Sequence, residues 1–266
     1  MKVINRFSMF FLLAVFISAC GNKALVEKEK KWIDLTYSFD SSTLYWPNNL
    51  CGFVHKTEAE GITPGGFYYS SYSFCTPEHG GTHLDAPVHF AKDHLSVDAV
   101  PLTSLTGKAI VVDVSAKALK NRDYLVSVDD LNAWEKVNGI IADSTIILFR
   151  TGYGQYYPNR EKYFGSPLTG VEAIPQLHFP GISAEAAQWL VDNHKAKAIG
   201  LDTPSLDYGQ STDFKTHQIL LGANIPGFEN VAHLDALPLK GIYVVALPMK
   251  IGKGSGAPLR IIANIE

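Results

Sequence analysis

Short apolar runs separated by turn-rich segments recur along the chain from residue 32 onward. Most of these runs are rich in valine, isoleucine and leucine, a composition typical of strands that are buried on both faces. In other segments, apolar residues recur every three or four positions, which predicts amphipathic helices. The chain therefore combines buried strands with helices. The expected strands are residues 32–37, 109–115, 145–149, 198–202, 241–247 and 259–265.

Two segments carry the signals of helices. Ser127 is followed by Asp129 and Asp130, an order typical of a helix N-terminus, and Gly139 marks the end of this helix. Ser183 begins a second helix as its N-cap. The side chains expected to face the core are Leu131, Trp134 and Val137 in the first helix and Ala187, Leu190 and Val191 in the second.

Other stretches are less regular. Residues 44–47 form an apolar, partly aromatic cluster, in which Trp46 fits a core position as well as a substrate-facing one. Residues 48–66 are rich in glycine, proline and polar side chains, which predicts a long loop. Residues 67–74 alternate aromatics with serines, as a strand does. Residues 153–180 hold many glycines, prolines and aromatics without a period, and we expect an irregular excursion over the functional site.

Length and composition indicate one soluble domain. A chain of 266 residues can bury a substantial core, and 46% hydrophobic with 18% charged residues is ordinary for a globular protein. No internal repeat or interdomain linker divides residues 32–266. The formal net charge of −3 and the lack of a lysine or arginine run predict no nucleic-acid partner.

The first residues indicate a targeting segment rather than a part of the fold. Lys2 and Arg6 precede the apolar run Met9–Ile17, which is too short to span a bilayer comfortably. The sequence Ile17-Ser18-Ala19-Cys20 resembles a bacterial lipobox, in which the cysteine is lipidated and becomes the mature N-terminus. We therefore expect a lipoprotein signal peptide over residues 1–19, lipidation at Cys20 and a tether over residues 20–31.

An ordinary secretory signal cut near Ala19 is the alternative reading of this segment. In both cases we expect the mature protein outside the cytoplasm. With lipidation, it is anchored to a bacterial membrane, on the periplasmic side or at the cell surface. Loss of Lys2 and Arg6 takes the formal charge from −3 to −5.

Two cysteines, Cys51 and Cys75, remain in the mature chain. In an oxidising compartment they can pair, and the closed loop would stabilise the fold by about 3 kcal/mol in the chain-entropy model. Two cysteines alone do not establish a bridge, so this pairing stays open.

The residues with the clearest chemistry lie between His79 and Phe90, in the run His-Gly-Gly-Thr-His-Leu-Asp-Ala-Pro-Val-His-Phe. His79, His83, Asp85 and His89 all occupy odd positions, which places them on one face of any extended segment. A helix fits less well, because glycines and a proline interrupt the run. A fully extended chain separates the first two histidines by roughly 13 Å, and the Gly80-Gly81 pair can supply the bend that shortens this distance. Imidazoles with a carboxylate suit zinc, manganese or iron. The alternative is a histidine-rich surface turn.

This run resembles the His-x-Gly-Thr-His-x-Asp-x-Pro-x-His signature of the cyclase family of metal-dependent hydrolases, which includes bacterial kynurenine formamidase and isatin hydrolase. Every fixed position of the signature is present, and the resemblance covers roughly residues 32 to 265. It implies an α/β domain of the swivelling β/β/α type, with a barrel-like mixed sheet and flanking helices. It also implies a homodimer.

The resemblance also implies the rest of the site. His217 and Glu229, each more typical of the surface when taken alone, match the distant His and Glu that bind metal in the formamidases. Asp202, Ser205 and Asp207 match a family Asp-Thr-x-Ser-x-Asp run, expected to orient the ligands or the backbone around them.

Two further motifs do not extend the site. His233-Leu234-Asp235 repeats the tripeptide of the first motif, but Glu229 stands where the earlier histidine would be, so His233 is interpreted as structural. Residues 252–258 are rich in glycine and lack the order of a phosphate loop. They resemble the family's C-terminal Gly-Ser-Gly-x-Pro turn.

The predicted chemistry is hydrolysis of a small amide with one or two ions, zinc or manganese. The ligand set comprises His79, His83, Asp85, His217 and Glu229. A bound divalent ion makes water acidic enough to act at neutral pH, and His89 is the candidate general base. The alternative role for His89 is a structural hydrogen bond to a backbone carbonyl.

The leading function is that of an arylformamidase of the kynurenine formamidase type. An isatin hydrolase-like activity on a cyclic amide is the alternative, and the C-terminal run over residues 247–260 looks closer to that branch. A lipid-anchored binding protein that keeps the metal site without turnover is the hypothesis from another class.

Overall fold

The computed structural model describes residues 31–265. The predicted signal peptide, Cys20 and all of the tether except Lys31 lie outside these residues, so they remain predictions. Within the described part of the chain, every helix is too short or too polar to cross a bilayer.

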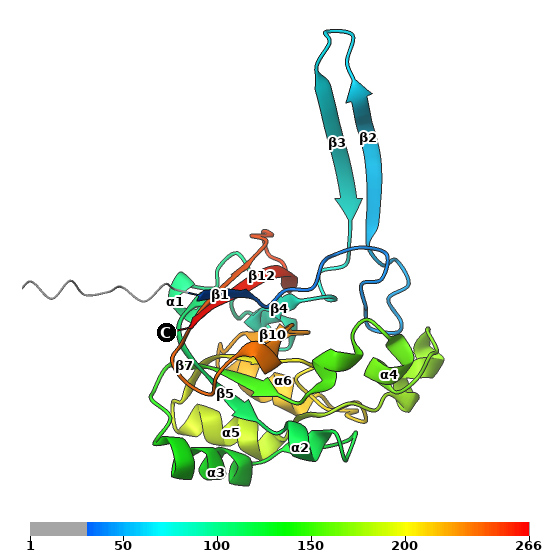
Figure 1. Cartoon of the computed structure of the whole chain (residues 1–266). Helices are drawn as coiled ribbons and strands as arrows, with labels where there is room; N and C mark the ends of the chain where they lie inside the picture. The colour runs from blue at the N-terminus through cyan, green and yellow to red at the C-terminus, as the bar shows by residue number, and fades with distance from the viewer. Residues whose placement is uncertain (1–30, 266) are drawn as a thin grey trace, which may run out of the picture.

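The central sheet is a closed, mixed barrel of seven strands with an eighth strand at its edge (Figure 1). The order β1-β12-β11-β5-β7-β9-β10-β4 closes because β12 also pairs with β4. Strands β5, β7, β9 and β10 run parallel, and the other pairs are antiparallel. The predicted α/β class with a barrel-like sheet and flanking helices is therefore confirmed. The strands are β1 (Lys31–Asp34), β4 (His83–Asp85), β5 (Thr106–Asp113), β7 (Thr145–Arg150), β9 (Ala196–Leu201), β10 (Gly227–Glu229), β11 (Ile242–Pro248) and β12 (Gly256–Ile265).

Side chains on the two faces of these strands form two separate cores. In β7, Ile146 and Leu148 pack with the side chains of the first core, which include those of β4, β10, β11 and β12, whereas Ile147 and Phe149 pack in the second core beneath the helices. This alternation is the inward and outward pattern of a barrel wall. The strands look continuously apolar in sequence because both of their faces are buried.

Three helices cover the outer face of the parallel strands, namely α3 (Val128–Asn138), α5 (Ala184–Asp192) and α6 (Lys215–Gly222). Ser127 caps α3 as expected, in a reciprocal capping box with Asp130, and Gly139 follows its last residue. The prediction that Val137 faces the core is wrong, since its side chain is 81% exposed. It lies in the last turn, beyond the point where the Trp134 indole N–H donates to the carbonyl of Val111 in β5.

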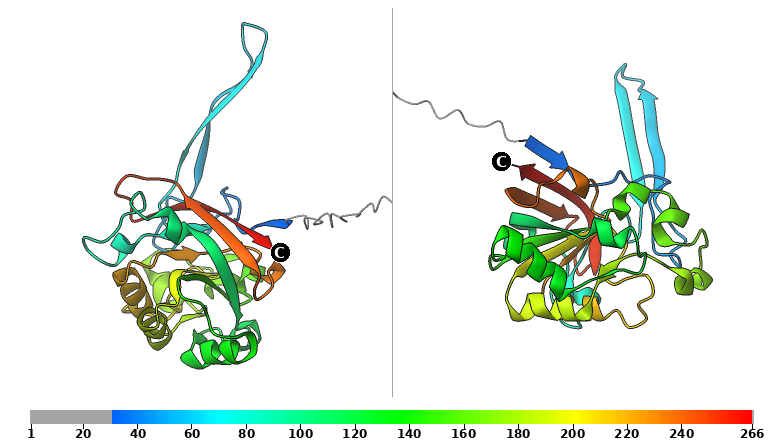
Figure 2. Two further views of the ribbon diagram at one scale, coloured as in Figure 1. Left: turned by 90° about the vertical axis from the view of Figure 1, so that its left-hand side faces the viewer. Right: turned by 60° about the horizontal axis from the view of Figure 1, so that its bottom comes forward.

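Two antiparallel strands, β2 (Val54–Ile62) and β3 (Tyr68–Cys75), form a long hairpin that projects away from the barrel (Figures 1 and 2). The long loop predicted over residues 48–66 is therefore wrong for β2. Both faces of this strand are exposed, so its sequence lacks the apolar period by which a half-buried strand is recognised. Cys51 and Cys75 are free and exposed.

The excursion over residues 153–180 consists of short helical turns, and it packs its aromatic side chains around Leu44 in a third small core. The cluster at residues 44–47 and this excursion therefore form one wall beside the barrel. The remaining short elements are α1 (Leu102–Leu105), α2 (Ser115–Ala118), α4 (Arg160–Phe164), the pair β6 (Leu125–Val126) and β8 (Gly181–Ile182), and the 3₁₀ turns η1 (Pro87–His89), η2 (Tyr153–Tyr156), η3 (Val171–Gln176) and η4 (Leu234–Ala236).

Candidate metal centre

The two shortest strands of the barrel, β4 and β10, contain three of the candidate metal ligands. Strand β4 lies between β10 and β12, and the register places Glu229 directly opposite His83. Leu84 and Phe228 point into the barrel core. Because side chains alternate along a strand, His83, Asp85 and Glu229 must project from the other face. That outer face meets helix α6, whose buried side includes His217.

Alternation explains only the pair His83 and Asp85, because β4 begins at His83. His79 reaches the site through a bend that depends on glycine. Gly81 has φ +55°, and a Cβ on Gly80 would stand 2.1 Å from the ring of Tyr45. His89 arrives from the other side, at the end of the 3₁₀ turn η1.

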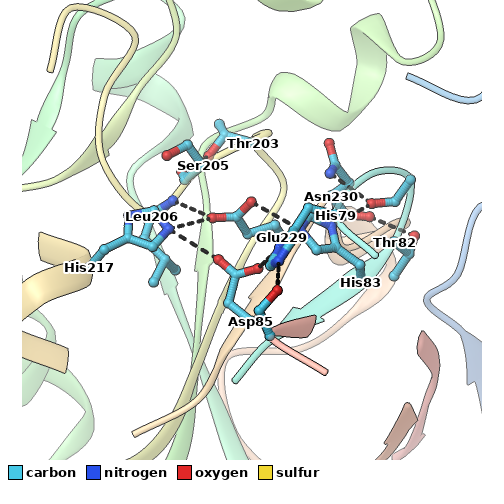
Figure 3. Close-up of polar contacts among 12 residues, drawn as sticks. His79, Thr82, His83, Asp85, Thr203, Ser205, Leu206, His217, Glu229 and Asn230 are labelled. Atoms are coloured by element: carbon cyan, nitrogen blue, oxygen red, sulfur yellow. Dashed lines mark hydrogen bonds and ion pairs between the residues drawn. The ribbon is translucent and has the colours of Figure 1, made fainter. Parts of the chain in front are cut away.

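Four buried side chains form what we call the inner group: His83, Asp85, His217 and Glu229 (Figure 3). The His83 Nε2 atom lies 3.2 Å from Asp85 Oδ1 and 3.4 Å from Glu229 Oε2. The His217 Nε2 atom lies 3.1 Å from both Asp85 Oδ2 and Glu229 Oε1. The two carboxylates thus lie between the two imidazoles.

Two further histidines, His79 and His89, form the outer group. Their rings stack at 3.9 Å between centroids. The Nδ1 atom of His79 lies 2.7 Å from Asp85 Oδ1, so this carboxylate belongs to both sides of the site. His89 is exposed and His79 is half-buried, in contrast to the inner group.

The donor atoms fit a metal ion. Among the described residues, ligand atoms of His83, Asp85 and Glu229 lie within 4.8 Å of one another, and so do those of His79, Asp85 and His89. Imidazole nitrogens and carboxylate oxygens are the donors that zinc and manganese take in proteins. Two carboxylates buried side by side repel each other, and a cation between them removes this cost. All five predicted metal ligands and His89 are therefore brought together in one place.

The electrostatics of the inner group follow from burial and from close opposite charges. Burial alone would lower the pKa of His83, but the Asp85 and Glu229 carboxylates outweigh it and raise this pKa to about 9. Burial and the neighbouring Asp85 charge raise the pKa of Glu229. In the outer group, the cavity withdraws much of the His89 ring from water although the residue is partly exposed, and this desolvation lowers its pKa to about 4. The Asp85 carboxylate opposes the shift and the neighbouring imidazoles add to it, so this ring is neutral at pH 7.

Three residues beside the ligands were predicted to orient them, and their contacts differ: Asp202, Ser205 and Asp207. Asp207 accepts a 2.6 Å hydrogen bond from Nδ1–H of His217, which directs the Nε2 atom at the carboxylates. Asp202 accepts hydrogen bonds from the backbone N–H and hydroxyl of Thr151, joining the ends of β7 and β9. Ser205 lines the cavity.

Several supporting groups were not found from the sequence. The backbone N–H of Leu206 donates to Glu229 Oε1 at 2.9 Å. Ser255 Oγ lies 2.9 Å from His79 Nε2 and 2.7 Å from a carboxylate oxygen of Glu78. The Gly-Ser-Gly turn was the available signal for Ser255, whereas a backbone N–H leaves no signal in the sequence. His233 lies apart from the centre, immediately before η4.

The inner and outer groups form the floor of a cavity of about 270 Å³. Its walls are mainly aromatic and come from the residues 44–47 cluster, the excursion and the segment before α6. Among the described residues, no lysine or arginine lines this cavity. The apolar and aromatic wall side chains are Leu44, Tyr45, Trp46, Phe90, Phe164, Pro204 and Phe214, and Ser205 and Asn230 add polar groups.

Comparisons with known proteins agree with this architecture. The chain is 30% identical over 262 residues to an isatin hydrolase of Roseibium aggregatum, covering 94% of this chain and 97% of that protein. It is 29% identical over 231 residues to a kynurenine formamidase of Salinibacter ruber, covering 86% of this chain and 95% of that protein.

Solved structures show the same likeness. Isatin hydrolase A from Ralstonia solanacearum superposes with a TM-score of 0.78 at 31% identity, over 89% of this chain and 92% of that chain. An isatin hydrolase bound to the product analogue thioisatinate gives a TM-score of 0.80 at 26% identity, over 89% and 93%. The Cyclase family model, described as "Putative cyclase", matches residues 33–208. Sequence and structure together show that this chain belongs to the cyclase family.

Proposed function

We propose that this protein is a metal-dependent hydrolase that cleaves the C–N bond of a small aromatic amide, with an arylformamide as the leading substrate class. One observation carries the proposal: six candidate ligand and acid–base side chains, His79, His83, Asp85, His89, His217 and Glu229, converge on the floor of an aromatic-walled cavity. The family membership supports it, since relatives named kynurenine formamidase and isatin hydrolase cover nearly the whole chain.

The inner group together with His79 would hold the ion, zinc or manganese. When bound, a divalent ion lowers the pKa of a coordinated water to about 7 and polarises a carbonyl. The side chains and backbone around the ligands hold those ligands in position. Asp207 directs His217, and the Leu206 N–H directs Glu229, so neither ligand is free to rotate away from the centre.

His89 is the proposed general base. Its ring is neutral at pH 7, because its pKa is lowered to about 4, and it is exposed at the cavity floor. The neutral ring has the free lone pair that is needed to accept a proton from the attacking water. The low pKa makes this ring a weak base, but it favours return of the proton to the leaving nitrogen. The group His79, Asp85 and His89 also forms a second candidate ion position, and occupation of that position would make His89 a ligand instead.

A cyclic amide of the isatin type is the second candidate substrate, because the cavity favours it. The walls are flat aromatic side chains, and no lysine or arginine among the described residues lines them to receive a carboxylate. A neutral, planar bicyclic amide suits such walls, whereas N-formylkynurenine carries an α-carboxylate for which these walls offer no lysine or arginine.

The direct experiment is to measure both reactions on the purified protein after metal removal and after addition of zinc or manganese. We expect metal-dependent release of product from N-formylkynurenine, isatin or both, and the ratio of the two kcat/KM values assigns the substrate class. No turnover of either compound by protein with full metal content would favour the binding-protein alternative.

We further propose that the protein acts outside the cytoplasm, anchored through a lipid on Cys20. The support is the charged and apolar segment before the lipobox-like Ile17-Ser18-Ala19-Cys20. Replacing Cys20→Ser should move the protein from the detergent phase to the aqueous phase on partitioning. Unchanged partitioning would leave an ordinary or uncleaved signal.

A further inference from the structure

The outer face of the antiparallel part of the barrel is not covered by the helices. Among the described residues, the second core beneath the helices contains no side chain of β1, β11 or β12. In the left-hand view of Figure 2, β11 and β12 lie in front and the long helices lie below them. The side chains that point outward from these three strands are therefore open to another molecule.

Strand β11 is apolar on this open face as well as on its inner face. Its inward residues Val244 and Ala246 pack in the first core. Because side chains alternate along a strand, Tyr243, Val245 and Leu247 point outward. An antiparallel sheet with one face in water normally carries polar side chains on that face. The packing of this chain alone therefore does not explain the outward residues of β11.

The neighbouring strands extend this apolar row. In the sheet register, Asn264 of β12 lies between Tyr243 of β11 and Trp32 of β1, and Ile262 of β12 lies opposite Val245. The five apolar side chains that share this surface, which we call the strand face, are Trp32, Tyr243, Val245, Leu247 and Ile262.

The strand face exposes a substantial apolar area. Its three largest contributors, Trp32, Tyr243 and Leu247, are 52%, 47% and 46% exposed. At roughly 200 Å² for each large side chain, these three expose on the order of 300 Å², a size at which an apolar patch is often functional.

The charge around the strand face is positive, although the chain as a whole carries a formal charge of −3. Residues 237–266, which include β11 and β12, contain four lysines and arginines and one acid. Residues 20–31, which lead into β1, contain four lysines and two glutamates. On the face itself, Lys108 is exposed opposite Tyr243, and Arg260 is paired with Asp34 at 2.7 Å. Basic side chains beside exposed apolar ones are typical of proteins that contact anionic lipid surfaces.

The position of the tether points to the same partner. Strand β1 begins at Lys31, which is eleven residues after the predicted lipidation site Cys20. Eleven residues span at most roughly 40 Å, so a lipid on Cys20 would keep Trp32 within that distance of the membrane. Contact with the membrane is then intramolecular, and even a weak contact is populated. Tryptophan and tyrosine are enriched at membrane–water interfaces, because their rings are apolar and their N–H and O–H groups are polar.

We propose that the strand face lies on an anionic lipid surface, the one to which Cys20 would anchor the chain. A second copy of this chain is a poorer partner, because it would bring the same positive charges against one another, whereas anionic lipids neutralise them. The contact depends on the proposed lipid anchor for its orientation and is independent of the proposed hydrolase activity.

The test uses the purified full chain on phosphatidylglycerol vesicles whose acyl chains carry bromine, which quenches a tryptophan only at close contact. The chain has four tryptophans, and the difference between wild type and Trp32→Phe gives the emission of Trp32 alone. We expect the bromine to quench most of this emission. Vesicles of brominated phosphatidylcholine should quench it less, because they carry no net charge.

Two variants test the contact itself. Tyr243→Asp places a negative charge on the strand face and should lower the ratio of docked to undocked protein about fivefold or more. Val137→Asp is the control, because Val137 is 81% exposed on helix α3, away from the strand face. Metal content and thermal melting equal to those of the wild type show that each variant is folded.

The outcomes separate the contact from the anchor. A chain that floats with the vesicles while Trp32 stays unquenched has the anchor but not the contact, and this result overturns the proposal even if Tyr243→Asp fails to fold. Equal quenching in Tyr243→Asp and Val137→Asp also overturns it. If Cys20→Ser still floats and its Trp32 is quenched, the strand face binds lipid without the anchor, and if neither form floats, both proposals are wrong. Protection of Trp32 from aqueous iodide before vesicles are added would show that protein covers the face instead.

Discussion

The two halves of the metal centre are built in different ways. In the inner group, His83 and Glu229 are opposed strand residues and His217 is held by Asp207, so buried hydrogen bonds fix each side chain. In the outer group, His79 comes from a glycine bend and His89 from a 3₁₀ turn, and both border the cavity. The rigid half suits retention of an ion, and the open half suits contact with substrate. Asp85 is common to both halves.

The largest effect is expected at this shared residue. Asp85→Asn keeps the size of the side chain but removes the charge that faces His79, His83 and His217. We expect loss of bound metal and of turnover together. The value of kcat/KM should fall by about 10⁴-fold or more, because the substitution removes a metal ligand and the negative charge that stabilises the bound ion. Elemental analysis beside the rate checks this, and full metal content in Asp85→Asn would contradict the shared role.

The next comparison places one substitution in each half. Glu229→Gln should lower metal affinity and rate together, because it removes a buried ligand. His89→Ala should keep the metal and the fold but lose about 10²–10⁴-fold in kcat, the usual worth of a positioned acid–base group. Metal titration and steady-state kinetics on both variants separate the halves. If His89→Ala loses metal as Glu229→Gln does, His89 is a ligand, and a near-normal rate excludes it as the base.

The sequence was enough to predict that the outer half and the β4 residues lie together, because these side chains fall within the eleven residues of one motif. It located His217 and Glu229 only through the family resemblance. Helix α6 has eight residues and no side-chain N-cap, since Phe214 precedes it in a left-handed conformation, and β10 has three residues. Such short elements lack the apolar period and the capping signals from which helices and strands are predicted.

The prediction of a loop in place of strand β2 failed for a different reason. Its β2 strand is regular in structure, but Lys56, Glu58 and Glu60 dominate its sequence and both faces are exposed. A pattern-based prediction depends on a buried face, which β2 lacks. Val137 in α3 shows the same limit, because periodicity finds the inward face of a helix but not how far the sheet beneath it extends.

A smaller effect should appear with pH in metal-free protein. The Asp85 and Glu229 carboxylates raise the pKa of buried His83 to about 9, above the usual 6.5. A raised folded-state pKa stabilises the fold fully below about pH 6.5, and this contribution is lost as the pH rises through about 9. Melting temperature without metal should therefore fall from pH 6.5 to 9. Metal affinity should rise over the same range, since the proton must leave before the ion binds. A melting temperature independent of pH would contradict the charged His83.

The smallest expected effect tests how the open half is held. Ser255 stands between His79 Nε2 and the Glu78 carboxylate. A carboxylate can only accept, so the serine hydroxyl donates to Glu78 and its oxygen accepts from Nε2–H of His79. With an ion bound, the proton on Nε2 would leave the Nδ1 lone pair as the ligand; without an ion, Nδ1–H donates to Asp85 Oδ1 at 2.7 Å.

Removal of this hydroxyl by Ser255→Ala should lower metal affinity about tenfold, the low end of the usual effect of a hydrogen-bond partner of a ligand. Ser255→Thr keeps the hydroxyl and should restore most of the affinity, which a purely packing role for Ser255 would not require. Competition with a chromogenic chelator measures the affinity without reference to turnover. Wild-type affinity in Ser255→Ala would show that the glycine bend alone orients His79. A loss as large as that of Glu229→Gln would instead make the outer half as important for retention as the inner half, and would remove the division between them.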